Sequence, residues 1–335
     1  MTETRFDVLC LGNAIVDVLS TVEDDFLVAK KVTKGSMTLI DQPRAEELYA
    51  AMGPATIISG GSGANTAVGI ASLGARAAFI GKVRTDEVGA LFTHDIRATG
   101  VHFATEAALS GPATARSFIL VTPDGQRSMN TYLGACQNLD GTDVDPDLVR
   151  ASAITYLEGY LWDPPAAKEA FKRAAAIAHE AGRKVAITLS DSFCVDRYRA
   201  EFLELIRSRT VDIVFANESE LHALYQAADF ETAAAAVGAE CDLAVVTRGA
   251  DGSLVITRDG ATAYQAAPIG ELVDTTGAGD LFAAGFLAGL ARGADHRTCA
   301  ALGALAAAEV IQHLGARPAK KLADLAAQQG LAAGA

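Results

Sequence analysis

Short apolar runs alternate with longer segments of helical periodicity along most of the chain. The first apolar run, VLCL at residues 8–11, has the length of a buried strand and ends at Gly12-Asn13. From about residue 151 the alternation is regular: the strand-like segments ASAITYLEGYL, KVAITLSD, VDIVFAN and LAVVT are separated by helical ones such as DRYRAEFLELIRSR. This rhythm predicts an α/β fold with a mostly parallel central sheet and helices on both faces.

The N-terminal third contains a predicted β-loop-α-β unit. ATIISGG reads as a strand, a small-residue helix follows from about Ala64 to Leu73, and RAAFIGKV reads as the next strand. Before this unit, FLVAKKVTKGSMTLID alternates and predicts strands with one exposed face, interrupted at Lys34-Gly35. QPRAEELYAAM and DEVGALFTHDIRATGV predict helices.

A β-rich insertion breaks the α/β rhythm between about His102 and Leu133. The segment ARSFILVTPDGQRSMNTYLG has two β-rich arms around Pro123-Asp124-Gly125, which predicts a hairpin. We find no clear domain boundary and therefore expect one domain over residues 1–335. It would carry a small β-rich lid assembled from about residues 14–40 and 102–133.

Composition and charge narrow the classes of function. Half of the 335 residues are hydrophobic, which allows a sizeable core, and the net charge of −13 argues against a nucleic-acid partner. The N-terminus has no basic region before its apolar run, and no apolar stretch approaches the ~18 residues of a membrane span. The five cysteines are scattered without a CxxC pair, so neither a disulfide framework nor structural zinc is expected, and a cytoplasmic location is the default.

The stretch VDTTGAGDLFAAGFLAGL, residues 273–290, carries the most specific chemistry. Its glycine-rich turn, Gly277-Ala278-Gly279, leads into an apolar helix, and exposed N–H groups at a helix N-terminus form an anion site. Asp280 at this junction is placed to accept a proton from an attacking hydroxyl while the turn holds a transferred phosphoryl group. A helix cap is the alternative, and this stretch alone does not decide between them.

Other polar and glycine residues follow predicted strands, where ligands bind in an open parallel sheet. Asp17 suits vicinal sugar hydroxyls, Asn65 offers both a donor and an acceptor, and the pair Asn217 and Glu220 can hold water around Mg²⁺. For each, an ordinary strand end, glycine turn or helix cap is the alternative. The residues selected on this ground are Asn13, Asp17, Gly61, Asn65, Asn217, Glu220, Thr247, Gly249 and Gly252.

Covalent and metal-centred chemistry have little support. None of the six histidines pairs at the spacing of metal ligands, and each is interpreted as structural or solvated. A GxSxG elbow and a cysteine–histidine pair are both missing from the sequence, which leaves nucleophilic catalysis without a candidate.

Taken together and in this order, the motifs resemble those of the PfkB family of carbohydrate and nucleoside kinases, which have the ribokinase-like fold. Two stretches carry the resemblance: GGSGANTAVGIASLGARAAFIGKVRTDEVG near the N-terminus and DTTGAGDLFAAGFLAGL near the C-terminus. The segments NESE and TRGADGS fall where the family has its Asn-x-x-Glu and nucleotide-loop elements.

The resemblance implies a role for each selected residue. Asp280 would be the catalytic base beside the anion hole of Gly277, Ala278 and Gly279. Asp17, Gly61 and Asn65, with Asn13 nearby, would bind the acceptor. Asn217 and Glu220 would hold Mg²⁺ through water, and Thr247, Gly249 and Gly252 would line the ATP site. Asp274 and Thr276 would lie beside a monovalent cation such as K⁺, which many members of the family bind.

The substrate is less specified than the reaction. DGQRSMNTYLGAC and the pattern GNAIVDVL…KGSMTLID resemble adenosine-kinase-like members, and five apolar or aromatic residues are expected near a purine: Met37, Leu39, Phe118, Tyr160 and Trp162. We therefore expect ATP-dependent phosphorylation of adenosine to AMP. A kinase for ribose, fructose or 2-keto-3-deoxygluconate stays open, as does a non-catalytic nucleoside sensor. Both a monomer and a homodimer are compatible with the sequence.

Overall fold

The computed structural model describes residues 4–331, so residues 1–3 and 332–335 of the expected domain lie outside the described residues. Its main feature is a nine-stranded sheet of order β14-β13-β12-β11-β10-β9-β1-β5-β6. Neighbouring strands from β12 to β6 run parallel, whereas β13 and β14 are antiparallel at one edge. These strands are β1 (Phe6–Leu11), β5 (Ala77–Ile80), β6 (His102–Phe103), β9 (Ser152–Glu158), β10 (Lys184–Thr188), β11 (Ile213–Asn217), β12 (Leu243–Thr247), β13 (Ser253–Thr257) and β14 (Gly260–Tyr264).

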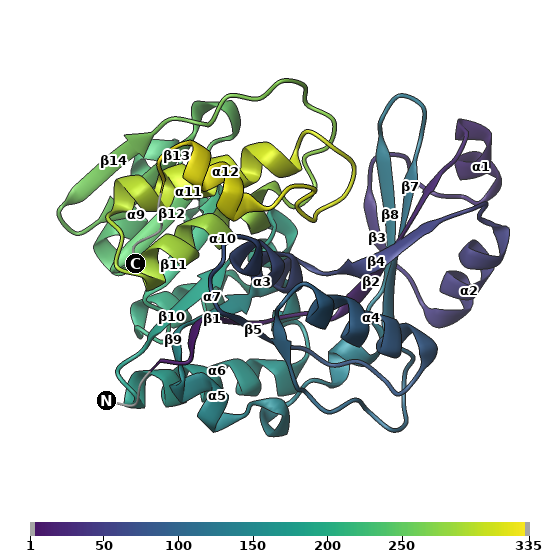
Figure 1. Cartoon of the computed structure of the whole chain (residues 1–335), viewed down its shortest axis with the longest axis horizontal. Helices are drawn as coiled ribbons and strands as arrows, with labels where there is room; N and C mark the ends of the chain where they lie inside the picture. The colour runs from purple at the N-terminus through teal and green to yellow at the C-terminus, as the bar shows by residue number, and fades with distance from the viewer. Residues whose placement is uncertain (1–3, 332–335) are drawn as a thin grey trace.

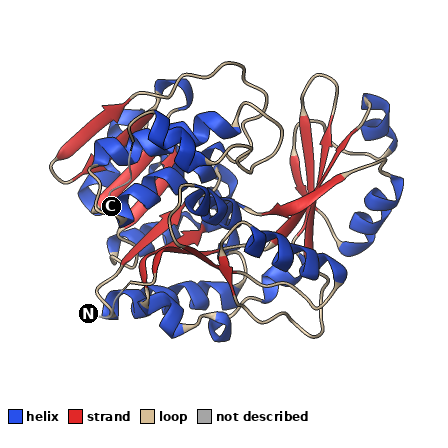
Figure 2. Cartoon of the chain, in the orientation of Figure 1, coloured by secondary structure: helices blue, strands red, loops and turns tan. Residues whose placement is uncertain are grey.

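Helices cover both faces of this sheet, as the alternating pattern predicts (Figure 2). In β1, Val8 and Cys10 belong to one apolar core, and Leu9 and Leu11 belong to the other. Both faces are therefore buried, which explains the continuous apolar run. Against the first core lie α3 (Ser62–Ser72), α4 (Glu87–Ala98), α10 (Ala278–Ala291), α11 (His296–Val310) and α12 (Leu322–Gln328); against the second lie α5 (Pro146–Arg150), α6 (Pro165–Glu180), α7 (Ser192–Arg207), α8 (Glu218–Tyr225) and α9 (Phe230–Glu240).

A second sheet of five strands stands at one side of the large sheet (Figure 1). Its order is β3-β8-β7-β2-β4, built from β2 (Ile15–Thr21), β3 (Met37–Leu39), β4 (Thr56–Gly60), β7 (Ala115–Val121) and β8 (Arg127–Tyr132). The helices α1 (Asp24–Ala29) and α2 (Gln42–Ala51) lie on the side away from the large sheet. The predicted hairpin is confirmed, because β7 and β8 pair antiparallel across the turn at residues 122–126.

The expected boundaries of the small sheet need three corrections. Strand β4, expected in the large sheet, pairs antiparallel with β2 of the small sheet. Strand β6, inside the expected 102–133 segment, pairs with β5 of the large sheet. Residues 26–29, expected as part of a strand, belong to α1, which has two aspartates in its first turn, and Leu27 packs against Leu120 of the small sheet.

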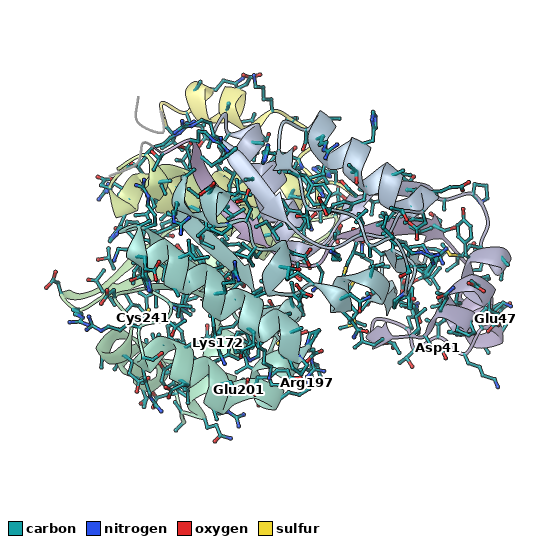
Figure 3. All side chains as sticks on the ribbon, turned by 90° about the horizontal axis from the view of Figure 1, so that it is seen from below. Asp41, Glu47, Lys172, Arg197, Glu201 and Cys241 are labelled. Carbon is teal, nitrogen blue, oxygen red and sulfur yellow. The ribbon has the colours of Figure 1, made fainter. Side chains whose placement is uncertain are left out.

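All five cysteines are free and buried. Within residues 4–331, no cluster of three or more His, Cys, Asp or Glu side chains has the arrangement of a metal site, and no helix is long and apolar enough to cross a bilayer. Charged side chains such as Lys172 and Glu201 lie on the outer faces of helices, and Asp41 and Glu47 mark the far end at α2 (Figure 3).

Candidate active site

A cavity of about 390 Å³ lies between the two sheets. The small sheet contributes Asp17, Ser117 and Met129, and the large sheet contributes residues at the carboxyl ends of its parallel strands. Most of the residues selected from the sequence line this one cavity: Asp17, Gly61, Asn65, Asn217, Glu220, Thr247, Thr276, Gly277, Ala278, Gly279 and Asp280.

The turn before α10 has the geometry of an anion site. Gly277 has a left-handed φ of 79°, and a Cβ there would stand 2.7 Å from the Cβ of Ala316, so the position requires glycine. No side chain caps this end of α10, although the N–H of Ala278 reaches the carbonyl of Thr275 at 3.2 Å. The remaining N–H groups of the first turn have no partner within the helix and face the cavity with the positive end of the helix dipole.

Asp280 does not cap its own helix. Its Oδ1 accepts a hydrogen bond from the Ser62 hydroxyl at 2.6 Å, and its Oδ2 accepts one from the Asn65 amide at 3.0 Å. Burial raises the pKa of Asp280, while these two hydrogen bonds and the nearby Arg317 charge oppose the rise. Two residues of α3 therefore hold the Asp280 carboxylate beside the anion site. Its raised pKa makes this carboxylate a stronger proton acceptor.

At the start of α3, one hydrogen-bond acceptor, the side-chain oxygen of Asn65, has no partner among the described residues. Gly61 has a φ of 95°, and a Cβ there would be 2.2 Å from the carbonyl oxygen of Asn13, so only glycine lets these chains approach. Asn65 Oδ1 is buried without a hydrogen-bond partner in the described structure. Because buried polar atoms nearly always have partners, this oxygen points to a ligand donor in the cavity.

Asp17 faces the same cavity from β2. Burial raises the pKa of this carboxyl to about 7, with Asp280 adding to the rise and Arg317 and Arg127 opposing it. An isolated carboxylate in such a place needs donors, and ligand hydroxyl groups would supply them.

Two further cavities adjoin the central one. One of about 380 Å³ shares Ile15, Ser62, Met129 and Tyr160 with it, and one of about 530 Å³ shares Thr247, Thr275, Ala278, Gly279 and Phe282. The three form a row with Asp280 and the anion turn in the middle. After the ligands that the sequence analysis leads us to expect in each, we call them the acceptor-side cavity, the central cavity and the nucleotide-side cavity.

Comparisons with known proteins agree with this geometry. A family model described as pfkB family carbohydrate kinase matches residues 8–322. The chain belongs to the pfkB kinase family. The adenosine kinase of Saccharomyces cerevisiae is 27% identical over 93% of this chain and 97% of its own length. The crystal structure of a probable sugar kinase from Rhizobium etli is 55% identical to this chain, with a TM-score of 0.93; the match covers 98% of this chain and 99% of that one. The crystal structure of an adenosine kinase from Sinorhizobium meliloti is also 55% identical, with a TM-score of 0.92; the match covers 97% of this chain and 100% of that one.

This pfkB kinase is thus a nucleoside or sugar kinase, a phosphotransferase that acts on an alcohol group and has the ribokinase-like fold. The family uses ATP, generally with Mg²⁺. Asp280 and the anion turn both line the central cavity of this kinase.

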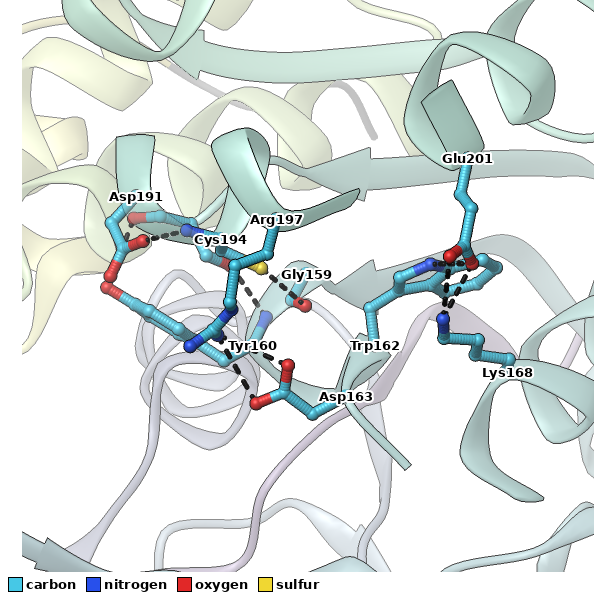
Figure 4. Close-up of polar contacts among 10 residues, drawn as sticks. Gly159, Tyr160, Trp162, Asp163, Lys168, Asp191, Cys194, Arg197 and Glu201 are labelled. Carbon is cyan, nitrogen blue, oxygen red and sulfur yellow. Dashed lines mark hydrogen bonds and ion pairs between the residues drawn. The ribbon is translucent and has the colours of Figure 1, made fainter. Parts of the chain in front are cut away.

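The acceptor-side cavity of this kinase is mostly apolar. Met37, Leu39 and Phe193 stand at it, exposed by 45%, 48% and 78%, and form an apolar rim that is open to solvent. Tyr160 lies between this cavity and the central one, and its hydroxyl donates to the carbonyl of Ser190 at 3.1 Å. Figure 4 shows Tyr160 beside Asp191, Arg197 and Asp163, the last two forming an ion pair of 3.2 Å.

Two aromatic residues expected near the purine are elsewhere. Phe118 is buried in the small cluster between the second sheet and α2, and Trp162 packs in the second core against Phe171 and Phe202. Both side chains are 1% exposed or less. Their apolar character reflects packing, whereas Met37, Leu39 and Tyr160 do line the cavity as expected.

Asn13 is engaged by a carboxylate that the sequence analysis did not select. Its N–H donates to Glu158 Oε2 at 3.1 Å and its side-chain amide to Oε1 at 2.6 Å, while the N–H of Gly63 donates to Oε2 at 2.7 Å. Burial raises the pKa of Glu158 to about 7, although the hydrogen bonds from these donors lower it. Glu158 thereby braces the start of α3, and Asn13 lines the acceptor-side cavity instead of the central one.

Asn217 and Glu220 form a capping box at the start of α8. The Asn217 side chain accepts from the Glu220 N–H at 2.9 Å, and Glu220 accepts from the N–H and the side-chain amide of Asn217 at 2.9 and 2.6 Å. Burial raises the pKa of Glu220 to about 7, and the charges of Asp191 and Asp280 add to this. The capping alternative is thus real, and both residues also line the central cavity.

The remaining selected residues separate into two places. Gly249 and Gly252 line the nucleotide-side cavity, where apolar residues such as Ile269, Leu272 and Ile311 dominate. Asp274 lines none of the three cavities, and both it and Thr276 contact Arg127 of β8.

Four residues at the site escaped selection from the sequence: Ser62, Glu158, Arg127 and Arg317. Ser62 lies inside the glycine-rich motif, and Glu158 is the last residue of β9, so position in the sequence was the signal that could have found both. Arg127 lies in the segment DGQRSMNTYLGAC, but its partners are far away in sequence. Arg317 donates to Ser59 at 3.1 Å, and burial lowers its pKa to about 10 while Asp17, Asp95 and Asp280 oppose that change.

Proposed function

We propose that this kinase transfers the γ-phosphoryl group of ATP to the 5′-hydroxyl of adenosine and forms AMP. The observation that carries the proposal is the apolar acceptor-side cavity, which adjoins the central cavity at Ser62 and Tyr160. A sugar needs only the central cavity, whereas a nucleoside needs a second, apolar space for its base.

The central cavity offers the groups that a ribose requires. The carboxylate of Asp17 accepts hydrogen bonds from vicinal hydroxyls, and the open Oδ1 of Asn65 accepts one more. Gly61 allows the sugar to approach the backbone at the start of α3. The base then lies between Met37 and Leu39 of the small sheet and Tyr160, which follows β9 of the large sheet.

Asp280 acts as the base in this proposal. Its carboxylate, oriented by Ser62 and Asn65, takes the proton of the acceptor hydroxyl as the oxygen attacks the γ-phosphorus. The N–H groups at the start of α10 stabilise the charge on the transferred phosphoryl group. Because Asp17 and Met129 belong to the small sheet, we propose that this sheet acts as a lid that excludes water once the acceptor is bound.

ATP occupies the nucleotide-side cavity in this arrangement. Thr247, Gly249 and Gly252 line it beside an apolar surface that suits the adenine ring, and the cavity opens onto the anion turn at Ala278 and Gly279. The γ-phosphate then reaches the central cavity from the side opposite the ribose.

Mg²⁺ would bind together with ATP, and Asn217 and Glu220 are suited to contact it through its bound water molecules. Glu220 is buried at the central cavity, and within residues 4–331 its carboxylate oxygens accept hydrogen bonds only from the neutral groups of Asn217. A cation held through water would stabilise its charged form. The metal, when bound with ATP, neutralises phosphate charge.

A coupled ADP-release assay over nucleosides and sugars with Mg-ATP tests the proposal. Adenosine should give the highest kcat/KM, and ribose and fructose should give little turnover. Turnover with ribose or fructose alone would refute the adenosine assignment while leaving the kinase intact. Binding of adenosine without ADP release with any acceptor would instead indicate a sensor.

A further inference from the structure

Arg127 connects the small sheet to the loop that precedes the anion turn. From the start of β8, its Nη2 forms an ion pair with Asp274 Oδ2 at 2.5 Å, and its Nη1 donates to the Thr276 hydroxyl at 3.1 Å. The side chains of Arg127 and Asp274 are only 10% and 2% exposed. The contact is therefore part of the protein interior, where ion pairs are least screened.

The oxygens expected to bind a monovalent cation already have protein partners. Asp274 Oδ1 accepts the N–H of Thr276 at 3.0 Å, and Oδ2 accepts the N–H of Gly315 at 3.0 Å in addition to the ion pair with Arg127. The Thr276 hydroxyl accepts from Arg127. A cation such as K⁺ would have to displace an arginine from its carboxylate and then sit beside that positive charge, so these residues do not fit the expected role.

We propose that the Arg127 guanidinium replaces a bound monovalent cation at this turn, so that the kinase works without K⁺. An arginine is charged at any accessible pH, and here one Nη forms an ion pair with the Asp274 carboxylate while the other donates to the Thr276 hydroxyl. Its charge adds to the positive potential of the α10 N-terminus, which begins two residues after Thr276. Arg127 lines none of the three cavities, so it is a positioning residue that acts through Asp274 and Thr276.

The replacement has a feature that a free ion lacks. Arg127 belongs to β8, which pairs with β7 and β3 of the small sheet, whereas Asp274 and Thr276 are joined to α10 on the large sheet. The positive charge therefore reaches the turn only when the two sheets are together. The inference rests on the kinase function and does not depend on which acceptor is used.

The test compares KCl with tetramethylammonium chloride at equal ionic strength, measuring ADP release and melting temperature. The wild-type chain should show equal values in both salts. Arg127→Gln should lose about tenfold in turnover in tetramethylammonium, and K⁺ should restore turnover and raise its melting temperature. Arg127→Lys should keep a smaller loss without a K⁺ response, because it retains the charge.

Arg116→Gln is the matched control, since Arg116 lies on the neighbouring strand β7 and stacks over Tyr49 and Phe118, outside the three cavities. Activation of the wild-type chain by K⁺ would overturn the inference, whether or not the variants fold. So would an Arg127→Gln variant that folds and responds to K⁺ in neither measurement. Failure of the adenosine assignment would appear in the acceptor screen, whereas the melting experiment needs no acceptor.

Discussion

The side-chain amide of Asn65 donates a hydrogen bond to Oδ2 of Asp280 at 3.0 Å, although 215 residues separate the two in sequence. The contact joins the N-terminal turns of α3 and α10, which carry the two glycine-rich motifs. Asn65→Ala removes this donor and the open acceptor Oδ1 together. We expect kcat to fall by about tenfold and KM for the acceptor to rise, since one donor orients the base and one acceptor binds the ligand. Steady-state kinetics with Asn138→Ala, at an exposed position, provides the control.

Asp280→Asn tests the proton acceptor itself. The amide keeps the shape of the side chain but cannot take the hydroxyl proton, so turnover should fall by about 1,000-fold while adenosine binding measured by calorimetry changes little. Asp259→Asn, exposed in the turn between β13 and β14, should behave as the wild-type chain. Near-normal turnover of Asp280→Asn would show that another group accepts the proton.

Asp17 predicts a pH dependence of acceptor binding. Its pKa is raised to about 7 by burial, so the carboxylate form that accepts two hydroxyl hydrogen bonds prevails above pH 7 and is lost below it. KM for adenosine should therefore rise as the pH falls through about 7, whereas KM for ATP should not follow the same curve. Equal responses of both constants would exclude Asp17 as the source.

The apolar rim of the acceptor-side cavity predicts which substitution weakens nucleoside binding. Leu39→Asp places a charge against the base and removes apolar contact worth about 1.4 kcal/mol, so KM for adenosine should rise about tenfold. Leu109→Asp is a matched control, because Leu109 is 85% exposed and lines none of the three cavities. If both variants keep the wild-type KM, the base does not bind in this cavity.

Glu158 makes stability depend on pH. Its folded-state pKa of about 7 exceeds the ordinary value of 4.5, so between these values the folded state keeps a proton that the unfolded state loses. Its contribution therefore lowers the free energy of unfolding as pH rises through this window, with a slope of up to about 1.4 kcal/mol per pH unit. In urea unfolding from pH 5 to 8, Glu158→Gln should have a shallower slope than the wild-type chain.

The control for this measurement is Glu231→Gln, at an exposed position of α9. It should reproduce the wild-type slope. The raised pKa values of Asp17 and Glu220 contribute to both curves in the same direction, so a residual slope in Glu158→Gln is expected. An unchanged slope in Glu158→Gln would mean that Glu158 is charged throughout this range.

The local pattern of apolar and polar residues was sufficient to predict the strands that are buried on both faces of the large sheet. The continuous apolar run of β1 and the regular alternation after residue 151 predicted parallel strands, and the structure confirms them. Strand β4 was assigned to the wrong sheet because a short strand has the same pattern in either one. Only its pairing with β2, from Leu19 opposite Thr56 to Ile15 opposite Gly60, decides the sheet, and no local feature encodes a pairing between residues so far apart in sequence.

The candidate site shows the same division. Glycine-rich turns and strand-end polar residues pointed to the central cavity, because motif and position are local properties. The partners of those residues are not local: Glu158 meets Asn13 across 145 residues, and Arg127 meets Thr276 across 149. For this reason Asn13 and Asp274 were selected as ligand contacts, whereas in the structure protein groups already bind their side chains. The catalytic and binding roles themselves remain predictions.

The five buried thiols allow local opening of the structure to be measured without an added probe. Cys136 donates to the carbonyl of Ala14 where the small sheet begins, and Cys194 donates to the carbonyl of Gly159 near the acceptor-side cavity. An alkylating reagent reaches a buried thiol only during a local or global opening. Timed alkylation followed by peptide mass measurement would therefore rank the regions by how often they open, with Cys241 reporting from the end of α9 and Cys299 from α11.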